Sequence, residues 1–117
     1  MKYLCLIYSD EKQLASWPEA QYKSAVAEYM AFTDGIRESG QLIAAERLQR
    51  THTATTIRSR NGKISTTDGP FAETKEQLGG FYLIDARDLN EAIQVASRIP
   101  GTRWGSIEVR PVWEMNV

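Results

Sequence analysis

The chain has 117 residues, of which 42% are hydrophobic and 25% are charged, so its length and composition fit one ordinary globular domain over residues 1–117. Fourteen Lys and Arg residues are balanced by fifteen Asp and Glu residues, which gives a net charge of −1. This balance lacks the strong positive field that nucleic-acid binding needs, so we expect no nucleic-acid partner.

The first expected element is a strand over residues 2–9, and its apolar side chains on both faces are typical of a central strand. The apolar run from Tyr3 to Tyr8 is too short for the core of a signal peptide, and no later run approaches the ~18 apolar residues of a membrane span. The single cysteine, Cys5, cannot form an internal disulfide. We therefore expect a soluble cytoplasmic protein with no membrane partner.

The second expected element is a long helix. Ser16 and Glu19 have the spacing of a capping box, with Pro18 inside the first helical turn. Gly40 ends the pattern, so the helix has about 22 residues and is long enough to cross a sheet. Its buried stripe is expected to contain Tyr22, Ala25, Val26, Tyr29, Phe32, Thr33 and Ile36.

The middle of the chain has the pattern of strands. Residues 41–48 are expected to form the second strand, and residues 54–60 and 63–67 are expected to pair as a hairpin. The Asn61-Gly62 dipeptide between them suits a type I′ turn, because both central residues of that turn need positive φ.

A charged loop follows the hairpin. It begins at Gly69-Pro70, and within it Thr74 and Gln77 have the spacing that caps one short helical turn. Residues 79–86 then return to a strand whose two faces are both apolar, so we expect a second central strand.

The last third of the chain is expected to hold one helix and one strand. Asp88 and Glu91 form a second capping box, and Pro100-Gly101 ends that helix. The final strand, residues 106–113, has one mixed face and is expected at an edge of the sheet. The apolar stripe of the helix is Leu89, Ala92, Ile93, Ala96 and Ile99, and the apolar face of the strand is Ile107, Val109 and Trp113.

The order of elements predicts an α+β fold with ferredoxin-like βαββαβ topology and an inserted β-hairpin. Right-handed crossovers place both helices on one face of a mainly antiparallel sheet. The other apolar face of the central strands then needs a cover, because a bare face of this kind would be a large exposed patch. We expect a homodimer with the two sheets face to face, and the alternative is a monomer whose bare face binds a different protein.

Residues 67–85, which contain Asp68-Gly69-Pro70-Phe71, resemble the DGPF signature of the YCII-related (YciI-like) family. Residues 54–58, 98–100 and 107–112 are similar to that family's pattern in order and spacing, so the resemblance spans essentially the whole chain. The resemblance implies a dimeric α+β barrel made of one YCII-related domain of the DGPF branch.

The same resemblance implies a bacterial protein, often encoded beside an extracytoplasmic-function sigma factor. Short YciI-like relatives carry a His and Asp pair that has been suggested as catalytic. This chain has one histidine, His52, which lies in the connection before Ala54, and its long helix has none. We therefore do not expect a His-Asp mechanism, and a lone loop histidine is more often exposed and idle.

Asp68 is the candidate catalytic residue. If the loop and a dimer cleft remove water from its carboxylate, Asp68 could act as a general acid or base. The structural alternative is that Asp68, two residues before Pro70, accepts backbone N–H bonds and fixes a turn.

The candidate ligand-binding residues lie on strands and in the charged loop. Arg58 and Arg110 could each bind a carboxylate in a bidentate manner, or they could pair with Glu46 and Glu108 across strands. Tyr82 could donate its phenol in a cleft or could simply pack in the core. The candidate set is Arg58, Arg110, Glu46, Lys75 and Tyr82.

No cofactor and no metal are expected. The chain has one His and one Cys and no zinc-ligand, EF-hand or nucleotide-loop spacing. The preferred hypothesis is a homodimer that binds a small polar or anionic metabolite, with acid-base catalysis by Asp68. The alternative is a non-enzymatic regulatory protein that acts with the sigma factor, or a motif that only stabilises the dimer.

Overall fold

The computed structural model describes residues 1–115, so the last two residues of the expected domain lie outside the described part. The elements in chain order are β1 (Lys2–Ser9), α1 (Glu11–Ala15), α2 (Glu19–Glu38), β2 (Leu42–Arg47), the 3₁₀ turn η1 (Thr51–Thr53), β3 (Thr55–Arg60), β4 (Lys63–Asp68), β5 (Gln77–Asp85), α3 (Leu89–Ala96), the 3₁₀ turn η2 (Pro100–Arg103) and β6 (Gly105–Pro111). Two structural regions follow from their pairing.

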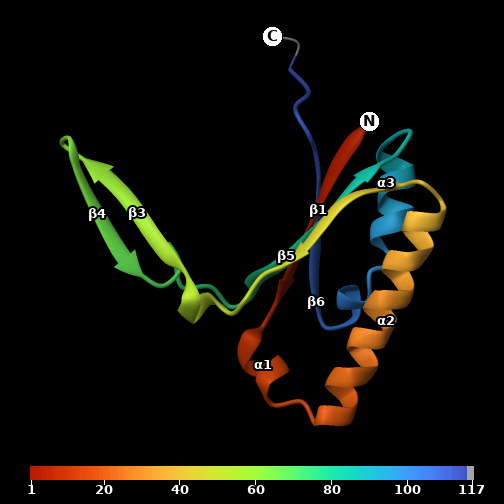
Figure 1. The fold of residues 1–117 in the computed structure, drawn as a ribbon, viewed down its shortest axis with the longest axis horizontal. Coiled ribbons are helices and arrows are strands. Elements are labelled where there is room, and N and C mark those ends of the chain that lie inside the picture. Colours follow the sequence, from red (N-terminus) through yellow and green to blue (C-terminus); the bar gives the residue numbers. More distant parts are fainter. Residues whose placement is uncertain (116–117) are drawn as a thin grey trace.

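The first region, which we call the body, is a four-stranded antiparallel sheet covered by helices. Its strand order is β2-β5-β1-β6, the order of a ferredoxin-like fold. The two strands with apolar side chains on both faces, β1 and β5, are central, and β6 is at an edge, which confirms the α+β prediction. Helices α2 and α3 lie on the same side of the sheet (Figure 1).

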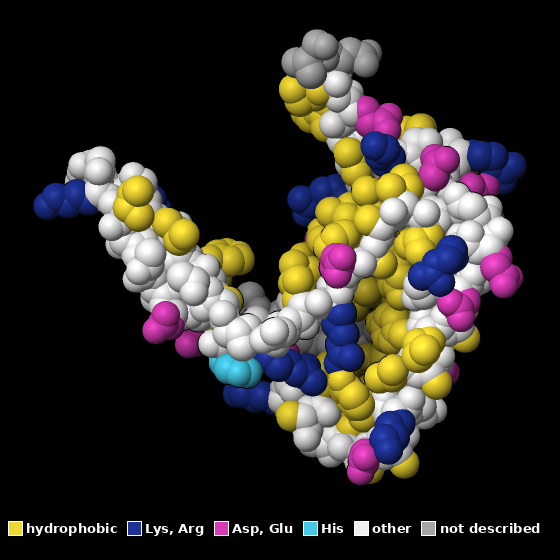
Figure 2. Space-filling model, viewed as in Figure 1, with side chains coloured by type: hydrophobic (Ala, Val, Ile, Leu, Met, Phe, Trp, Pro, Cys, Tyr) yellow, Lys and Arg dark blue, Asp and Glu magenta, His cyan; other side chains and the backbone are white. Residues whose placement is uncertain are grey.

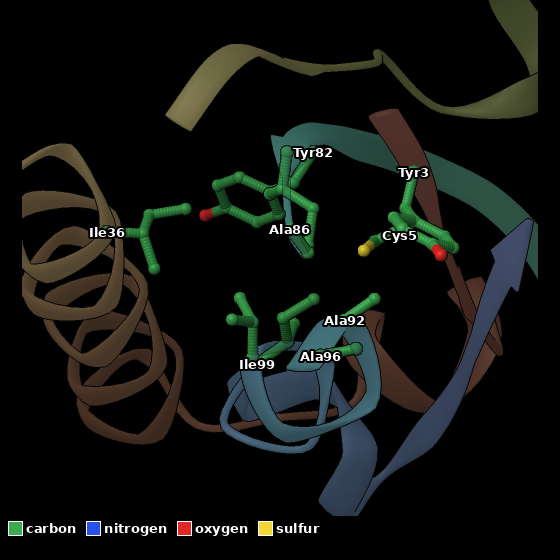
Figure 3. Packing of buried hydrophobic residues seen from close by; sticks show 10 residues of the cluster. Tyr3, Cys5, Ile36, Tyr82, Ala86, Ala92, Ala96 and Ile99 are labelled. Carbon is green, nitrogen blue, oxygen red and sulfur yellow. The ribbon is translucent and has the colours of Figure 1, made fainter. Parts of the chain in front are cut away.

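The two faces of the sheet differ in burial. Paired side chains on the helix-covered face are enclosed, including Tyr3 with Ile84 and Cys5 with Tyr82. On the opposite face, Leu4 pairs with Leu83 and is only half-buried. Figure 3 shows how the enclosed side chains from the sheet meet those of the helices. The buried cluster is Tyr3, Cys5, Ile36, Tyr82, Ile84, Ala86, Ala92, Val95, Ala96 and Ile99.

The start of α2 corrects one expectation. The helix begins at Glu19 after Pro18, and no side chain caps it, so Ser16 and Glu19 do not form a capping box. The reason is that Asp10 starts a separate short helix, α1, by accepting bonds from two backbone N–H groups. Ser16 then ends α1, and its hydroxyl donates to the carbonyl of Gln13.

The end of α2 is as expected. Gly40 has φ +79° and follows the C-cap residue Ser39. The N–H of Gly40 donates to the carbonyl of Arg37, and the N–H of Gln41 donates to the carbonyl of Ile36. These two bonds form a Schellman motif, which explains why a glycine stops the helix here.

The second half of the body is confirmed in outline and corrected in detail. The side chain of Asp88 caps α3 by accepting from the N–H of Glu91 at 2.9 Å. Leu89 and Ile93 were expected in the buried stripe, but both are exposed, because Ala92, Val95 and Ala96 form the face that meets the sheet. Strand β6 ends at Pro111, so Trp113 lies beyond it and is 87% exposed.

The second region, which we call the arm, is the hairpin of β3 and β4. These strands pair only with each other, and all six residues of β4 are exposed. Asn61 (φ 53°) and Gly62 (φ 76°) form the turn with the positive φ values that the sequence predicts. The arm projects from the body in Figure 1, which explains a radius of gyration of 16.4 Å against about 13 Å for a compact chain of this length.

The loop after the arm contains no helical turn. The hydroxyl of Thr74 donates to the carbonyl of Glu76, and the side-chain amide of Gln77 donates back to the carbonyl of Thr74. These local bonds replace the helical turn that the Thr74 and Gln77 spacing predicts, because both side chains satisfy backbone groups in a bent conformation.

Candidate functional site

A cavity of about 530 Å³ lies between α2 and the β2 side of the sheet. It exists because small residues stand where the helix faces the sheet: Ala25 on α2, Ala45 on β2, and Gly79 and Gly80 on β5. A side chain at Gly80 is excluded, since its Cβ would lie 2.7 Å from the carbonyl oxygen of Glu46. The volume falls within the usual range of small-molecule sites.

Aromatic rings form much of the cavity wall. Trp17 and Trp104 meet edge to face with ring centroids 5.0 Å apart, and Tyr29 meets Trp104 at 6.4 Å. Edge-to-face packing of this kind holds the rings in fixed orientations. The aromatic residues of the lining are Trp17, Tyr22, Tyr29, Tyr82 and Trp104.

Hydroxyl groups of the lining form a defined hydrogen-bond chain. The hydroxyl of Thr33 donates to the carbonyl of Tyr29 at 2.8 Å, which uses its single proton. The 2.7 Å contact between Thr33 and Tyr82 therefore has Tyr82 as the donor. Tyr82 extends from β5 toward α2 (Figure 3).

Both tyrosines stay neutral at physiological pH. Burial raises the pKa of Tyr82, although the bond to Thr33 opposes this rise. Burial also raises the pKa of Tyr29 to about 12, although its hydroxyl accepts a bond from the N–H of Gly101 at 3.1 Å. The inner polar groups are thus uncharged, and any charge in the site comes from the rim.

The rim is built by bonds between separate segments. The carboxylate of Glu11 accepts from both the N–H and the hydroxyl of Thr51, at 2.9 and 2.8 Å. The N–H of Glu11 donates to the side-chain oxygen of Gln77 at 2.9 Å. On the other side, the guanidinium of Arg47 donates to the hydroxyl of Tyr22 and lies 5.5 Å from the centre of that ring.

Two of the six candidates from the sequence line this cavity. Tyr82 does so with its buried ring. Glu46 also belongs to the lining, but it pairs with Phe81 in the register, so its side chain leaves the strand on the face opposite Ala45 and Tyr82. The carbonyl oxygen of Glu46 lies next to Gly80, another lining residue.

Arg110 lies elsewhere, on the sheet face that no helix covers. Its guanidinium bonds Glu108, and the hydroxyl of Tyr8 donates to the same carboxylate at 3.3 Å. The bond from Arg110 holds the pKa of Glu108 below its usual range. The pair forms along β6, between residues two apart on one face, and not across strands as the structural alternative from the sequence has it.

The remaining candidates belong to the arm and the loop after it. Asp68 ends β4 and is exposed, and Lys75 is exposed in the loop. The guanidinium of Arg58 donates to the carbonyl of Phe71 at 3.1 Å, which ties β3 to that loop. His52 is exposed at the base of the arm (Figure 2). The structure therefore does not bring Asp68, Arg58 and Lys75 together with the cavity.

Sequence reasoning missed the arginines of the rim. Arg37, Arg47 and Arg50 all line the cavity, and Arg37 pairs with Asp34 at 2.9 Å. One signal was available: Arg47 follows Ala45 by two residues in β2, so both side chains leave the same face of the strand. Arg50 lies in an irregular connection, for which no periodicity gives a direction.

Two further findings concern the described part of the chain. Within residues 1–115, no three His, Cys, Asp or Glu side chains lie close enough together to hold a metal ion. The helices of the same residues include none that is long and apolar enough to cross a membrane.

Comparison with known proteins gives the family and the fold. "Uncharacterized protein R00369" of Rhizobium meliloti (strain 1021) is 40% identical over 116 residues, which cover 96% of this chain and 92% of that protein. A solved structure of 5-chloro-2-hydroxyhydroquinone dehydrochlorinase (TftG) from Burkholderia phenoliruptrix AC1100, in complex with 2,5-dihydroxybenzoquinone, is similar in fold, with a TM-score of 0.57 and 13% identity over 99% of this chain and 96% of that one. The YCII-related domain matches residues 1–116, and the chain belongs to this family.

Proposed function

We propose that this protein binds a small polar or anionic metabolite in the cavity between α2 and the sheet. The observation that supports the proposal is the cavity itself: about 530 Å³, walled by aromatic rings and bordered by arginines. Sites for small molecules are typically concave and apolar with a few placed polar groups, as here. The fold neighbour TftG was solved with a small ring compound, which agrees with this reading of the fold.

The binding test compares two substitutions on one helix. Ala25→Phe fills the cavity from α2, whereas Ala27→Phe adds the same ring at an exposed position two residues away. In a thermal-shift screen of small organic acids and polar metabolites, compounds that stabilise the wild type and Ala27→Phe are expected to have no effect on Ala25→Phe. Equal stabilisation of all three proteins contradicts the proposal. Ala25→Leu serves if the larger ring prevents folding.

We further propose that the active form is a homodimer, the dimeric α+β barrel, with its two sheets face to face. Support comes from the sheet face without helices, where Leu4, Leu6, Phe81 and Leu83 are half-buried and apolar. In sedimentation at micromolar concentration the wild type is expected as a dimer and Leu6→Glu as a monomer. Leu89→Glu, at an exposed position on α3, is the matched control and should stay dimeric.

Acid-base catalysis by Asp68 is the enzymatic part of the proposal. The carboxylate is exposed in the single chain and lies outside the cavity, so this role requires the second subunit of the proposed dimer to bring it against the bound compound and to remove water from it. Asp68→Asn is then expected to abolish turnover of a bound compound while its binding to the cavity persists. Full turnover by Asp68→Asn removes the residue from the mechanism.

The exposed arm favours a second function, that of a regulatory protein acting with a sigma factor. Ile57 and Ile64 of the arm and Phe71 of the loop after it are all exposed. Figure 2 shows hydrophobic side chains on the surface of the arm. Under this alternative a purified extracytoplasmic-function sigma factor of the same organism, the class of partner that the family resemblance implies, binds the wild type but not a variant in which these three residues are serine. The cavity variant Ala25→Phe should bind it normally. Failure of the purified pair to associate removes this function.

A further inference from the structure

The cavity rim holds more uncompensated positive than negative charge. The charged residues of the lining are Arg37, Arg47, Arg50, Glu11, Asp34 and Glu46. Asp34 is neutralised by Arg37, and the side chain of Glu46 leaves the opposite face of β2. Both oxygens of Glu11 accept hydrogen bonds from Thr51, so the protein itself already satisfies this carboxylate.

Two guanidinium groups remain. Arg47 bonds only an uncharged group, the hydroxyl of Tyr22. Arg50 lines the cavity and is half-buried, and among the described residues its guanidinium forms no hydrogen bond or ion pair. A partly buried guanidinium without an acceptor favours an anion, and a carboxylate fits its planar fork by accepting two parallel bonds.

The interior of the cavity suits an uncharged aromatic group, unlike the rim, which suits an anion. Apart from the chain from Tyr82 through Thr33 to the carbonyl of Tyr29, and the polar side chains of Ser9, Gln49 and Gln77, the uncharged residues of the lining are apolar or aromatic. The edge-to-face pair of Trp17 and Trp104 presents both a ring face and a ring edge, which suits another flat ring better than a flexible polar chain.

We propose that the ligand is a ring-bearing organic carboxylate, with its ring among the aromatic walls and its carboxylate held by Arg50 together with Arg47. This inference rests on the proposed function and narrows it, because it names the class of ligand and its orientation. It also moves anion recognition from Arg58 and Arg110, which lie outside the cavity, to the end of β2 and the residues just after it.

The experiment uses the cavity's own fluorophores. Trp17 and Trp104 line the cavity, and Trp113 is exposed beyond β6, so Trp113→Phe leaves a protein whose emission reports on the site. In this background, phenylacetate is titrated against phenylacetamide, its neutral counterpart, and against acetate, which lacks the ring. Arg50→Gln is compared with Arg98→Gln, an exposed arginine that does not line the cavity.

Phenylacetate is expected to bind about tenfold more tightly than phenylacetamide, and acetate should show no saturable change. Because a hydrogen bond to a charged group is involved, Arg50→Gln should weaken phenylacetate binding about 10- to 100-fold, and Arg98→Gln should not. Binding of phenylacetamide should be unchanged in both variants. Far-UV circular dichroism must show that Arg50→Gln is folded.

Two outcomes overturn the inference in distinguishable ways. If phenylacetamide binds as tightly as phenylacetate and Arg50→Gln changes neither, anion recognition by Arg50 is wrong, while cavity binding that Ala25→Phe blocks still supports the proposed function. If neither aromatic compound binds, but the wild type binds a metabolite without a ring and Ala25→Phe abolishes that binding, the requirement for a ring is wrong. If Ala25→Phe blocks no ligand at all, the proposed function itself fails.

Discussion

The body and the arm use the same type of side chain in opposite environments. Ile36 in the body is 1% exposed, whereas Ile64 in the arm is 75% exposed. The body is ordered by burial of apolar side chains, which is the main stabilising term in folding. The arm is ordered by a two-residue turn and by strand pairing, and a two-stranded hairpin alone is only marginally stable. A side chain's contribution therefore depends on its region.

The largest expected difference comes from truncating one isoleucine in each region. Ile36→Ala removes buried methylene groups and leaves a cavity, so it should lower the free energy of unfolding by about 2–5 kcal/mol. Ile64→Ala, made in the Leu6→Glu background that is expected to be monomeric, should change it by less than about 0.5 kcal/mol. Urea denaturation measures the change in the free energy of unfolding of each variant relative to its own parent protein. Similar losses would show that the arm is packed like the body.

A smaller difference is expected from two glycines with the same backbone strain. Gly40 (φ +79°) ends α2, and Gly62 (φ +76°) turns the arm, and in neither case would an added Cβ meet an atom within 4 Å. Each change to alanine should cost about 1–2 kcal/mol of local conformational energy. Gly40→Ala should lower the global free energy of unfolding, whereas Gly62→Ala should only increase hydrogen exchange in β3 and β4. Global destabilisation by Gly62→Ala would mean that the arm unfolds together with the body.

The pH dependence of stability sharpens the account of the body. Burial raises the pKa of the Cys5 thiol to about 11, so the folded chain keeps a proton that the unfolded chain loses near pH 9. The free energy of unfolding should therefore hold below pH 8 and fall as pH rises from 9 toward 11, by about 1 kcal/mol at pH 10 from this group. Cys5→Ala should show a shallower fall between pH 8 and 10. An unchanged slope would exclude the thiol as its source.

The smallest effect on the body is expected from removing most of the arm. Thr55 lies opposite Asp68 in the register, so replacing residues 56–67 by Asn-Gly closes the hairpin at its base. In the Leu6→Glu background, this deletion should change the free energy of unfolding by less than about 0.5 kcal/mol, as measured by thermal unfolding. Loss of the folded body in this variant would contradict the separation of the two regions.

The outline of the fold follows from local patterns in the sequence. Period-two alternation predicts the central strands β1 and β5, and the Asn61-Gly62 turn fixes the arm. Local patterns fail where two signals compete. Asp10 takes the capping role and reduces Ser16 to the end of α1, and a small shift of the α3 stripe exposes Ile93.

The cavity is harder to predict, because it is formed by side chains that are missing. Ala25, Ala45 and Gly80 come from three distant segments, and no periodicity connects them. Asp68 and Lys75 are candidates in the sequence because they are charged residues in or next to the predicted loop. Their distance from the cavity depends on how the arm is oriented relative to the body. The turn and the strand register do not predict that orientation.

The small residues that open the cavity differ in how freely they can change. Gly80 is fixed by the backbone oxygen of Glu46, whereas Ala25 and Ala45 line the open space of the cavity. Substitutions at these two alanines would therefore change the size of the cavity. The sheet and its helices would stay the same. If the proposed binding is right, these two alanines are the positions at which the size of the ligand would be set.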